Sequence, residues 1–499
     1  MSSLRRNTSF VRLFLGRLAT NAGDSLYFIG AMWLVYHLTG SSLYTGIAGF
    51  LVQLPTSAQF LFGPLVDRWE LRRVLVGTQV VQGVFVLAVP LAAATGHLSV
   101  WVVLVVMPVL SLVNQFVYPA QTAVLPRIVD DENLVRANSL FSTAYQGADV
   151  VFNAAGGAII AVVGATTLFV VDSVTFAVAA LLFVGLTLPA VDADEAETGD
   201  AADDDVAADD ASATDAETTV DESTPEEDAT EDAEMKDATA DAGTGEAGTD
   251  GAVAAATAGD GQAEADAADA PRDPDDADDA DADADEGYLA DLREGIDYLR
   301  GSVVLSMVLG AMVSNVGGGA MMAVLPAFAD TLGGPETYGL LMAATAGGNL
   351  VGAATASLVE DTPYGPFSIV GFTFSSVALV TVPFAPGPLS TAVLIAVSLV
   401  PIGAFNVMFA SMLQSSVDEA LLGRVSAVVS SLTAVMVPVG NLIGGAVAEA
   451  VAPGSVLYLL AGTTMLLAVY FLVHPRIRSL PSVSEADEAT LGLPSPSDT

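Results

Sequence analysis

GPLVDRWELRR, residues Gly63 to Arg73, joins two long apolar segments and gathers positive charge in the loop between them. Arg68, Arg72 and Arg73 fall within six residues of a chain that has only 16 Lys and Arg residues among 499. Because Lys and Arg accumulate in the cytoplasmic loops of membrane proteins, the stretch predicts that two membrane-spanning helices are joined here at the cytoplasmic surface.

The composition supports a membrane protein. Hydrophobic residues make up 52% of the chain and the mean hydropathy is +0.57, which is unusual for a soluble protein. The net charge of −43 does not contradict this reading, because 37 of the 59 acidic residues lie between residues 192 and 286. Outside that interval the chain consists of two strongly apolar blocks, 6–190 and 303–473.

The two apolar blocks contain twelve segments of the length that a spanning helix needs, which is about 20 residues. Their glycines suit close helix packing in lipid, and they lack the polar–apolar alternation of β-barrel strands. The sequence therefore predicts an all-α membrane protein with twelve transmembrane helices in two six-helix bundles. The predicted spans are 11–36, 44–65, 74–94, 99–118, 140–163, 167–188, 304–329, 338–359, 366–384, 389–412, 425–448 and 455–473.

Basic residues occur only in alternate loops, which predicts the orientation of the chain. Arginines lie before the first span, after spans two, four and ten, and after the last span. The remaining short loops, at 37–43, 95–98, 164–166, 330–337, 385–388 and 450–454, contain no Lys or Arg. We therefore expect a multi-pass protein of the cell membrane with both termini and the acidic interval in the cytoplasm.

The chain contains an internal duplication, which makes the two bundles pseudo-symmetric. VDDENLVR at 129–136 matches VDEALLGR at 417–424 at an offset of 288 residues. Two acid–arginine pairs and two glycine pairs recur at this offset: Asp130 and Arg136 with Asp418 and Arg424, and Gly156 and Gly157 with Gly444 and Gly445. Nearer the start of each half the offset is 293 to 294. Transporters built from such halves bind their substrate between them, near the middle of the membrane.

GPLVDRWELRR resembles the loop motif of the major facilitator superfamily, roughly G-x-L-x-D-R-x-G-R-R. The matching residues are Gly63, Leu65, Asp67, Arg68, Arg72 and Arg73, whereas Glu70 replaces the usual glycine and the spacing beyond it is one residue longer. LATNAGDSLY at 18–27, YPAQTAVLPRIVDDENLVRANSL at 118–140 and LADLREGIDYLRGSVVL at 289–305 resemble the siderophore- and macrolide-efflux (transmembrane secretion effector) branch. The resemblance covers about 1–190 and 287–475.

The resemblance implies that this loop is a cytoplasmic gate. In the family such a carboxylate, here Asp67, interacts with a neighbouring helix terminus across the two halves, so the contact breaks when the cavity opens inward. A carboxylate at a helix N-terminus gains about 0.3–1 kcal/mol, which permits reversible breaking. The alternative is that Gly63, Asp67, Arg68, Arg72 and Arg73 only anchor the topology.

Ionisable residues inside predicted spans are costly and usually face a cavity. Arg17, Asn21 and Asp24 follow spacings of four and three residues, which places them on one helical face. Their counterparts in the second half are uncharged: Ala311, Asn315 and Gly318. Asp24 is the first candidate for an ion-coupling carboxylate, with Arg17 and Asn21 beside it. The alternative is a structural Arg17–Asp24 pair.

Two further carboxylates lie within the spans. Asp149 shares a polar face with Gln146 and Asn153 and is a second cavity candidate. Asp172 is weaker, since simple solvent exposure near the outer end of its span would also explain it. Helix packing and bending are expected at Gly156, Gly157, Pro438, Gly440, Gly444 and Gly445.

The predicted organisation is a bundle at 1–190, a disordered acidic loop at 191–286, an amphipathic connector helix at 287–302, a second bundle at 303–475 and a cytoplasmic tail at 476–499. The acid-rich, lysine-poor composition resembles that of proteins from salt-loving archaea. The acidic loop is either a solvated linker or a regulatory, partner-binding segment.

These features predict a secondary transporter, not an enzyme. Without cysteine, a His/Cys/carboxylate cluster or a phosphate-binding loop, neither a metal site nor a cofactor is expected. The predicted partners are a small amphipathic or hydrophobic substrate, a coupling H⁺ or Na⁺ and the lipid bilayer, with no nucleic acid, and the chain is expected to be a monomer. Alternatives are an uncoupled facilitator and a non-transporting receptor or scaffold that signals through the acidic loop.

Overall fold

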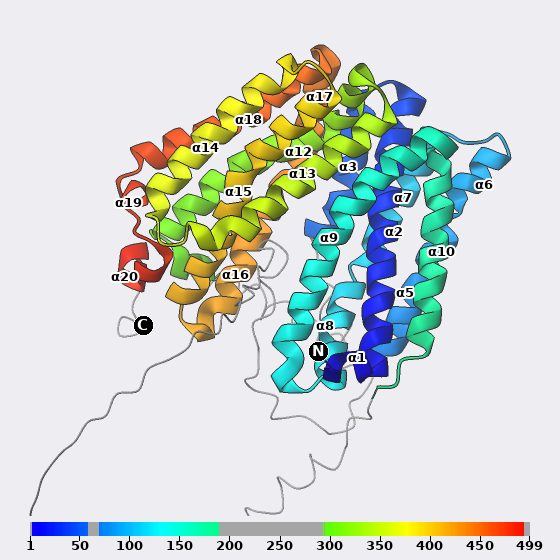
Figure 1. Ribbon diagram of the computed structural model, residues 1–499, viewed down its shortest axis with the longest axis horizontal. Coiled ribbons are helices and arrows are strands. Elements are labelled where there is room, and N and C mark those ends of the chain that lie inside the picture. Colours follow the sequence, from blue (N-terminus) through cyan, green and yellow to red (C-terminus); the bar gives the residue numbers. More distant parts are fainter. Residues whose placement is uncertain (1, 58–68, 189–292, 294, 494–499) are drawn as a thin grey trace, which may run out of the picture. The chain divides into compact units, whose positions relative to one another are not determined.

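The computed structural model describes residues 2–57, 69–188, 293 and 295–493. All regular structure within these ranges is helical, and no strand occurs in them. The first half contains these helices (Figure 1): α1 Ser2–Arg6, α2 Thr8–Thr39, α3 Ser42–Ser57, α5 Leu71–Val86, α6 Ala88–Ala94, α7 Val100–Asn114, α8 Val117–Ile128, α9 Asp131–Val163 and α10 Ala165–Val184.

The second half begins after the acidic interval, which lies outside the described residues. Its helices, coloured from green to red in Figure 1, are α12 Val303–Leu332, α13 Pro335–Thr355, η4 Ala356–Leu358, α14 Tyr364–Thr381, η5 Val382–Phe384, α15 Pro388–Ser416, α16 Glu419–Ala434, α17 Met436–Ala450, η6 Pro453–Val456, α18 Leu457–Val473, α19 Pro475–Arg478, η7 Val483–Glu485 and α20 Glu488–Leu491.

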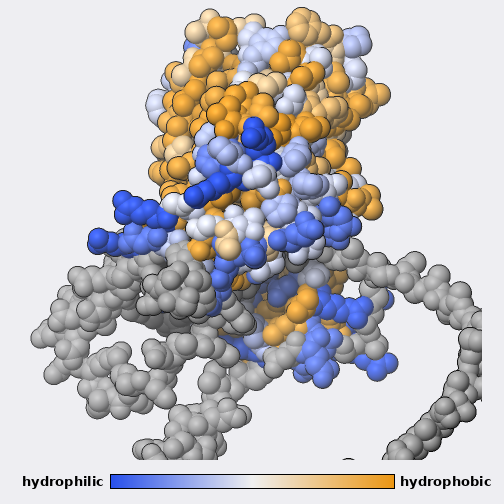
Figure 2. Space-filling model, turned by 90° about the vertical axis from the view of Figure 1, so that its left-hand side faces the viewer, coloured by the Kyte–Doolittle hydropathy of each residue, from blue (hydrophilic) through white to orange (hydrophobic). Residues whose placement is uncertain are grey.

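The described part of the chain contains ten helices that are long and apolar enough to cross a membrane. The 32-residue α2 is not among them, in keeping with the polar residues in its middle, and α3 is described only as far as Ser57. A multi-pass membrane protein is therefore established, while the count of twelve spans stays a prediction. Figure 2 shows an apolar band on one face, which agrees with exposed side chains such as Val370, Phe374 and Leu466.

Proline explains three interruptions in the long helices. Proline lacks an N–H group and its ring clashes with the carbonyl four residues earlier. The helix α5 ends at Val86, four residues before Pro90. Likewise α16 ends at Ala434, four residues before Pro438, and α7 ends five residues before Pro119. Pro438, an expected bending position, thus lies just beyond a break between two helical segments.

Two pairs of glycines lie where helices of the two halves cross. A Cβ atom added to Gly157 of α9 would lie 2.6 Å from the Cα of Gly339 of α13. One added to Gly445 of α17 would lie 3.0 Å from the Cα of Gly46 of α3. The duplication relates Gly157 to Gly445 and Gly46 to Gly339, so the two crossings occupy equivalent positions. Only glycine permits backbones to approach this closely.

A third close packing joins α17 to α12 inside the second half. A Cβ atom added to Gly440 would lie 2.2 Å from the carbonyl oxygen of Val316, and one added to Gly444 would lie 2.3 Å from the Cα of Ala320. These glycines are four residues apart and so lie on one face of α17. Gly156 faces α2, where its added Cβ would make an ordinary 3.4 Å contact with Leu26 and Ile29.

The segment after α18 folds back onto the second half instead of extending from it. The backbone N–H of Tyr364 donates a 2.9 Å hydrogen bond to the carbonyl of Pro481. Ile477, Leu480 and Leu491 are buried in the same apolar cluster as Leu299. The predicted tail at 476–499 therefore contributes packed residues as far as its described end.

We expect Gly157→Ala to destabilise the protein, because the added methyl group would meet backbone atoms of Pro335 and Gly339 that cannot move aside. Overpacking of this kind costs about 1–3 kcal/mol, so the midpoint of thermal unfolding in detergent should fall by several degrees. Gly147→Ala in the same helix is the matched control, since its added Cβ would meet no atom within 4 Å. Equal midpoints for the two variants would contradict the crossing.

Candidate functional site

The polar face of α2 lies in the interior of the first half. Arg17 is only 8% exposed, whereas Asn21 and Asp24 are partly exposed. The helix begins at Asn7, whose side chain accepts a hydrogen bond from the Phe10 N–H, and ends at Gly40 in the left-handed conformation. These caps define both ends of α2, and its polar face is directed at α8 and α9.

Arg17 is held by side chains from two other helices. Its Nε donates a 2.6 Å hydrogen bond to Oε1 of Gln121 on α8. The hydroxyl of Tyr145 on α9 donates a 2.7 Å hydrogen bond to the same oxygen. The guanidinium also lies 5.6 Å from the centre of the Tyr145 ring, within the range of a cation–π interaction. We call Arg17, Gln121 and Tyr145 the arginine cluster.

Asp24 takes no part in the arginine cluster by direct contact. Within the described ranges no ion pair joins it to Arg17, so the structure does not contain the close Arg17–Asp24 pair considered as the alternative role. Its carboxylate is nevertheless subject to the opposite charge of Arg17 and the like charge of Asp149. Asp24 is therefore a residue of intermediate exposure whose carboxylate has no hydrogen bond among the described residues and feels one positive and one negative group nearby.

Asp149 faces the same helix from α9. Its Oδ1 accepts a 2.5 Å hydrogen bond from the hydroxyl of Ser25, the residue that follows Asp24. This contact links α2 to α9 on the side where Asn21 and Asp24 lie. The structure thus brings Asp149 next to the face of α2 that carries Arg17, Asn21 and Asp24. The spacing in the sequence predicted the common face of the three α2 residues but not this neighbour.

Asp172 lies near the outer end of its predicted span, where solvent exposure was one explanation for a carboxylate. Its side chain is 0% exposed, so the explanation by solvent exposure is wrong. Oδ1 accepts a 3.2 Å hydrogen bond from the Thr175 hydroxyl, and Oδ2 is buried with no hydrogen-bond partner among the residues that the structure describes. Asp172 lies directly against Gly23 of α2, where an added Cβ would be 2.3 Å from its Oδ1. The burial follows from this close packing of α10 on α2.

Part of the arginine-rich loop lies outside the described residues, including Gly63, Asp67 and Arg68. Arg72 donates a hydrogen bond to the carbonyl of Val184, and Arg12 donates one to the neighbouring carbonyl of Gly185, so both cations cap the C-terminal end of α10. Arg73 pairs with Glu70 at 2.7 Å, but both side chains are well exposed and such pairs add little stability.

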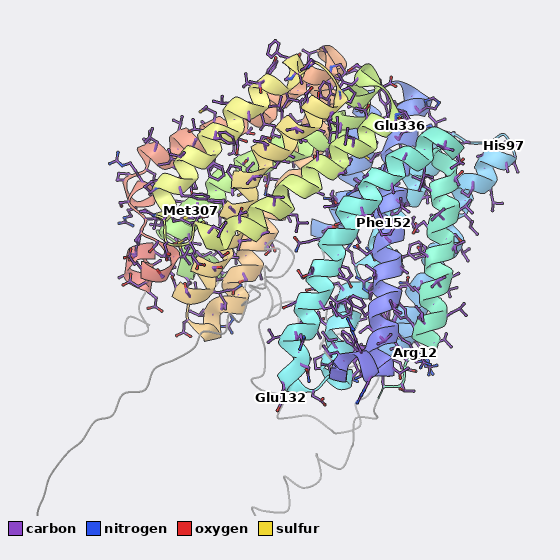
Figure 3. All side chains as sticks on the ribbon, viewed as in Figure 1. Arg12, His97, Glu132, Phe152, Met307 and Glu336 are labelled. Atoms are coloured by element: carbon purple, nitrogen blue, oxygen red, sulfur yellow. The ribbon has the colours of Figure 1, made fainter. Side chains whose placement is uncertain are left out.

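The duplicated loops occupy matching places at the start of a helix. Asp130 precedes α9, and the backbone carbonyl of Asp418 accepts hydrogen bonds from the N–H groups of Leu421 and Leu422 at the start of α16. Arg136 is exposed on α9, whereas the backbone of Arg424 on α16 lies against Gly295 of the connector segment. Figure 3 shows Glu132 and Arg12 at one end of the first half and His97 at the other.

A family model described as Major Facilitator Superfamily matches residues 13–435. The chain belongs to the major facilitator superfamily. It is therefore a membrane transporter and not an enzyme, and the family predicted from the arginine-rich loop is confirmed.

Sequence relatives of this superfamily member match over limited segments. Macrolide efflux protein A of Streptococcus pyogenes is 26% identical over 144 residues, which is 27% of this chain and 35% of that protein. The uncharacterized MFS-type transporter YkuC of Bacillus subtilis (strain 168) is 24% identical over 186 residues, 37% of this chain and 43% of that protein. The matches span less than half the length of these relatives.

Solved structures match over nearly the whole chain and show the fold. A bacterial homologue of the iron transporter ferroportin in an inward-facing state has a TM-score of 0.57 at 16% identity and covers 95% of this chain and 99% of its own. The nucleoside transporter NupG has a TM-score of 0.55 at 12% identity, with 93% and 98% coverage. At these identities the likeness carries no information about substrate.

We expect Gln121→Leu to lower stability more than Tyr145→Phe does. The first change leaves the buried Arg17 guanidinium without its acceptor, which costs about 1–3 kcal/mol or more for a charged group. The second keeps the aromatic ring beside Arg17 and removes a single hydroxyl. Thermal unfolding in detergent measures both. Equal losses, or a larger loss for Tyr145→Phe, would show that Gln121 is not the residue that holds Arg17.

Proposed function

We propose that this superfamily member is a secondary active transporter that couples the export of a small amphipathic or hydrophobic molecule to H⁺ or Na⁺. The observation that carries the proposal is Asp24, a carboxylate on the inner face of α2 without a hydrogen bond among the described residues. An ion-coupled transporter needs a site that can gain and lose a cation during the cycle, and ionisable residues inside the membrane commonly mark such sites. A carboxylate whose oxygens are already fully bonded would be a poor site for such exchange.

The surroundings of Asp24 suit cation exchange. Arg17 supplies a fixed positive charge that the arginine cluster holds in place. Asp149 supplies a second carboxylate, which also contacts α2 through Ser25. A proton or sodium ion bound at Asp24 changes the net charge of this face by one. A change of charge can favour one arrangement of the halves over another only if the two arrangements bind the cation with different affinity.

Transport by alternating access requires the halves to separate at the outer end. We place the arginine-bearing loops and both termini in the cytoplasm, so the loop at 37–43 is outer. There the Ser41 hydroxyl donates a 2.8 Å hydrogen bond to the Glu449 carboxylate of the other half. Both glycine crossings lie near this outer end as well. They are close to the first residues of α3 and α13 and to the last residues of α17 and α9. The cytoplasmic gate at Asp67 would alternate with this outer contact.

The uncoupled facilitator remains the second candidate, and the same measurements distinguish it. A facilitator would move substrate down its own gradient and would not respond to an imposed ion gradient. A receptor or scaffold would move no substrate at all. Macrolide efflux protein A makes a macrolide one suitable member of the first substrate panel, together with small aromatic amphiphiles.

We expect Asp24→Asn to abolish transport driven by an imposed pH or sodium gradient, because the amide cannot exchange a cation. The measurement is uptake of the panel compounds into proteoliposomes with and without each gradient. Asp330→Asn is the matched control, since it makes the same chemical change at an exposed position near the end of α12. Gradient-driven transport that survives in Asp24→Asn would refute the role of Asp24 as the coupling carboxylate.

A disulfide between the halves should stop transport. The chain contains no cysteine, so the double variant Ser41→Cys, Glu449→Cys introduces the only thiols. Oxidation should cross-link the pair and reduce uptake to background, and reduction should restore it. Each single variant is the control for damage by the substitution itself. Full transport by protein that is completely cross-linked would argue against separation of the halves at this end.

A further inference from the structure

The second half contains a cavity of about 150 Å³ among α12, α14, α15, α16 and α18. Met307, labelled on α12 in Figure 3, is one of its lining residues. Among the described residues that line it there is no Asp, Glu, Lys, Arg or His, so this lining carries no charge. In the first half, by contrast, the interior between the corresponding helices contains a charged arginine.

The duplication shows how this difference arises. At the offset of 294 residues Arg17 corresponds to Ala311, and at the offset of 288 residues Gln121 and Tyr145 correspond to Phe409 and Thr433. All three counterparts line the cavity. Alanine in place of arginine and threonine in place of tyrosine remove much side-chain volume, whereas phenylalanine in place of glutamine adds a smaller amount. In the first half the arginine cluster occupies this position. In the second half its counterparts border the cavity instead.

Aromatic rings form one side of the cavity. The rings of Phe405 and Phe409 are stacked with their centres 6.1 Å apart, and the Phe372 ring lies 4.8 Å from that of Phe405. Aromatic side chains favour stacked or edge contacts with further rings. A cavity of about 150 Å³ is large enough to hold a benzene molecule. Its size and walls therefore suit a single aromatic ring.

Three polar side chains that line the cavity have no hydrogen-bond partner in the described part of the chain. Among the described residues no hydrogen bond reaches the side-chain amides of Asn406 and Gln414 or the hydroxyl of Ser430, which all line the cavity. Asn315 is different, since its Nδ2 donates a 3.0 Å hydrogen bond to the Thr433 carbonyl. Neutral donors and acceptors without partners offer hydrogen bonds to a ligand, while an ionised ligand would find no opposite charge.

We propose that this cavity binds an uncharged aromatic ring that bears an amide or hydroxyl group, either as a small substrate or as part of a larger one. The inference rests on the proposed function in that it names the substrate class of the same transporter. According to this inference the two halves have different roles. The first half exchanges the cation, and the second half binds the neutral part of the substrate that bears the ring.

Three probes with one ring and different charge test the proposal: benzamide, benzoate and benzylammonium. Titrations of the purified full-length protein, followed by saturation-transfer NMR, should show benzamide binding about tenfold or more tightly than either ion, because the cavity cannot compensate a charge. Ala311→Leu should abolish benzamide binding by filling the space. Gly318→Leu is the matched control, since it adds the same side chain on α12 where an added Cβ meets no atom within 4 Å.

Asn406→Asp provides a second readout that does not depend on filling the cavity. The change places a carboxylate among the same walls, so benzylammonium should become the preferred probe. Asn406→Ala should weaken benzamide binding about two- to tenfold through loss of one hydrogen bond. Asn349→Ala is its control, because Asn349 lies outside the cavity and bonds within its own helix.

The outcomes separate this inference from the proposed function. Equal affinity for the three probes, or benzamide binding that Ala311→Leu leaves unchanged, would overturn the inference even if ion-driven transport were found. Selective benzamide binding that responds to Ala311→Leu and Asn406→Asp would support it. If that protein then failed to transport any panel compound, the proposed function would fail while the binding site remained.

Discussion

The structure depends on the close approach of backbones at the two glycine crossings between its halves. At Gly157 with Gly339 and at Gly445 with Gly46 there is no room for a side chain. In lipid the hydrophobic effect does not drive helices together, so packing at short range must hold them. Because the two crossings are related by the duplication, they form an equivalent pair of contacts. Both crossings therefore hold the halves together in the conformation that the structure shows.

Duplication gave both halves the same framework, and a few substitutions gave them different chemistry. In the first half Arg17 occupies the interior and needs Gln121 and Tyr145 to satisfy it. In the second half the counterparts Ala311 and Thr433 border an open, uncharged cavity. In the first half, hydrogen bonds offset the free-energy cost of burying the Arg17 guanidinium. In the second half this cost does not arise, because the counterpart of Arg17 is alanine. The asymmetry is therefore a property of side chains and not of helix arrangement.

Much of this could be predicted from the sequence, and the part that could not has a physical reason. Hydropathy located the ten long apolar helices of the described residues, and the matched glycines at 156–157 and 444–445 marked positions where helices approach closely, because both signals are local. The spacing of Arg17, Asn21 and Asp24 gave their common face. The partners of Arg17 come from α8 and α9, more than 100 residues away, so no local pattern identifies them. The sequence left solvent exposure of Asp172 open, because its burial depends on Gly23, a residue of another helix.

The helix α9 connects the proposed ion site to the glycine crossing with α13. This helix carries Tyr145 of the arginine cluster, Asp149 beside α2, and Gly157 at the crossing with α13. Asp149 lies four residues after Tyr145 and so shares its side of the helix, whereas Gly157, twelve residues after Tyr145, is turned by about 120° around the axis. We propose that a cation bound near Asp24 alters the charge facing Asp149 and hence the contact between α2 and α9. Because α9 is one continuous helix, a change in its angle would then also move Gly157, which contacts the other half.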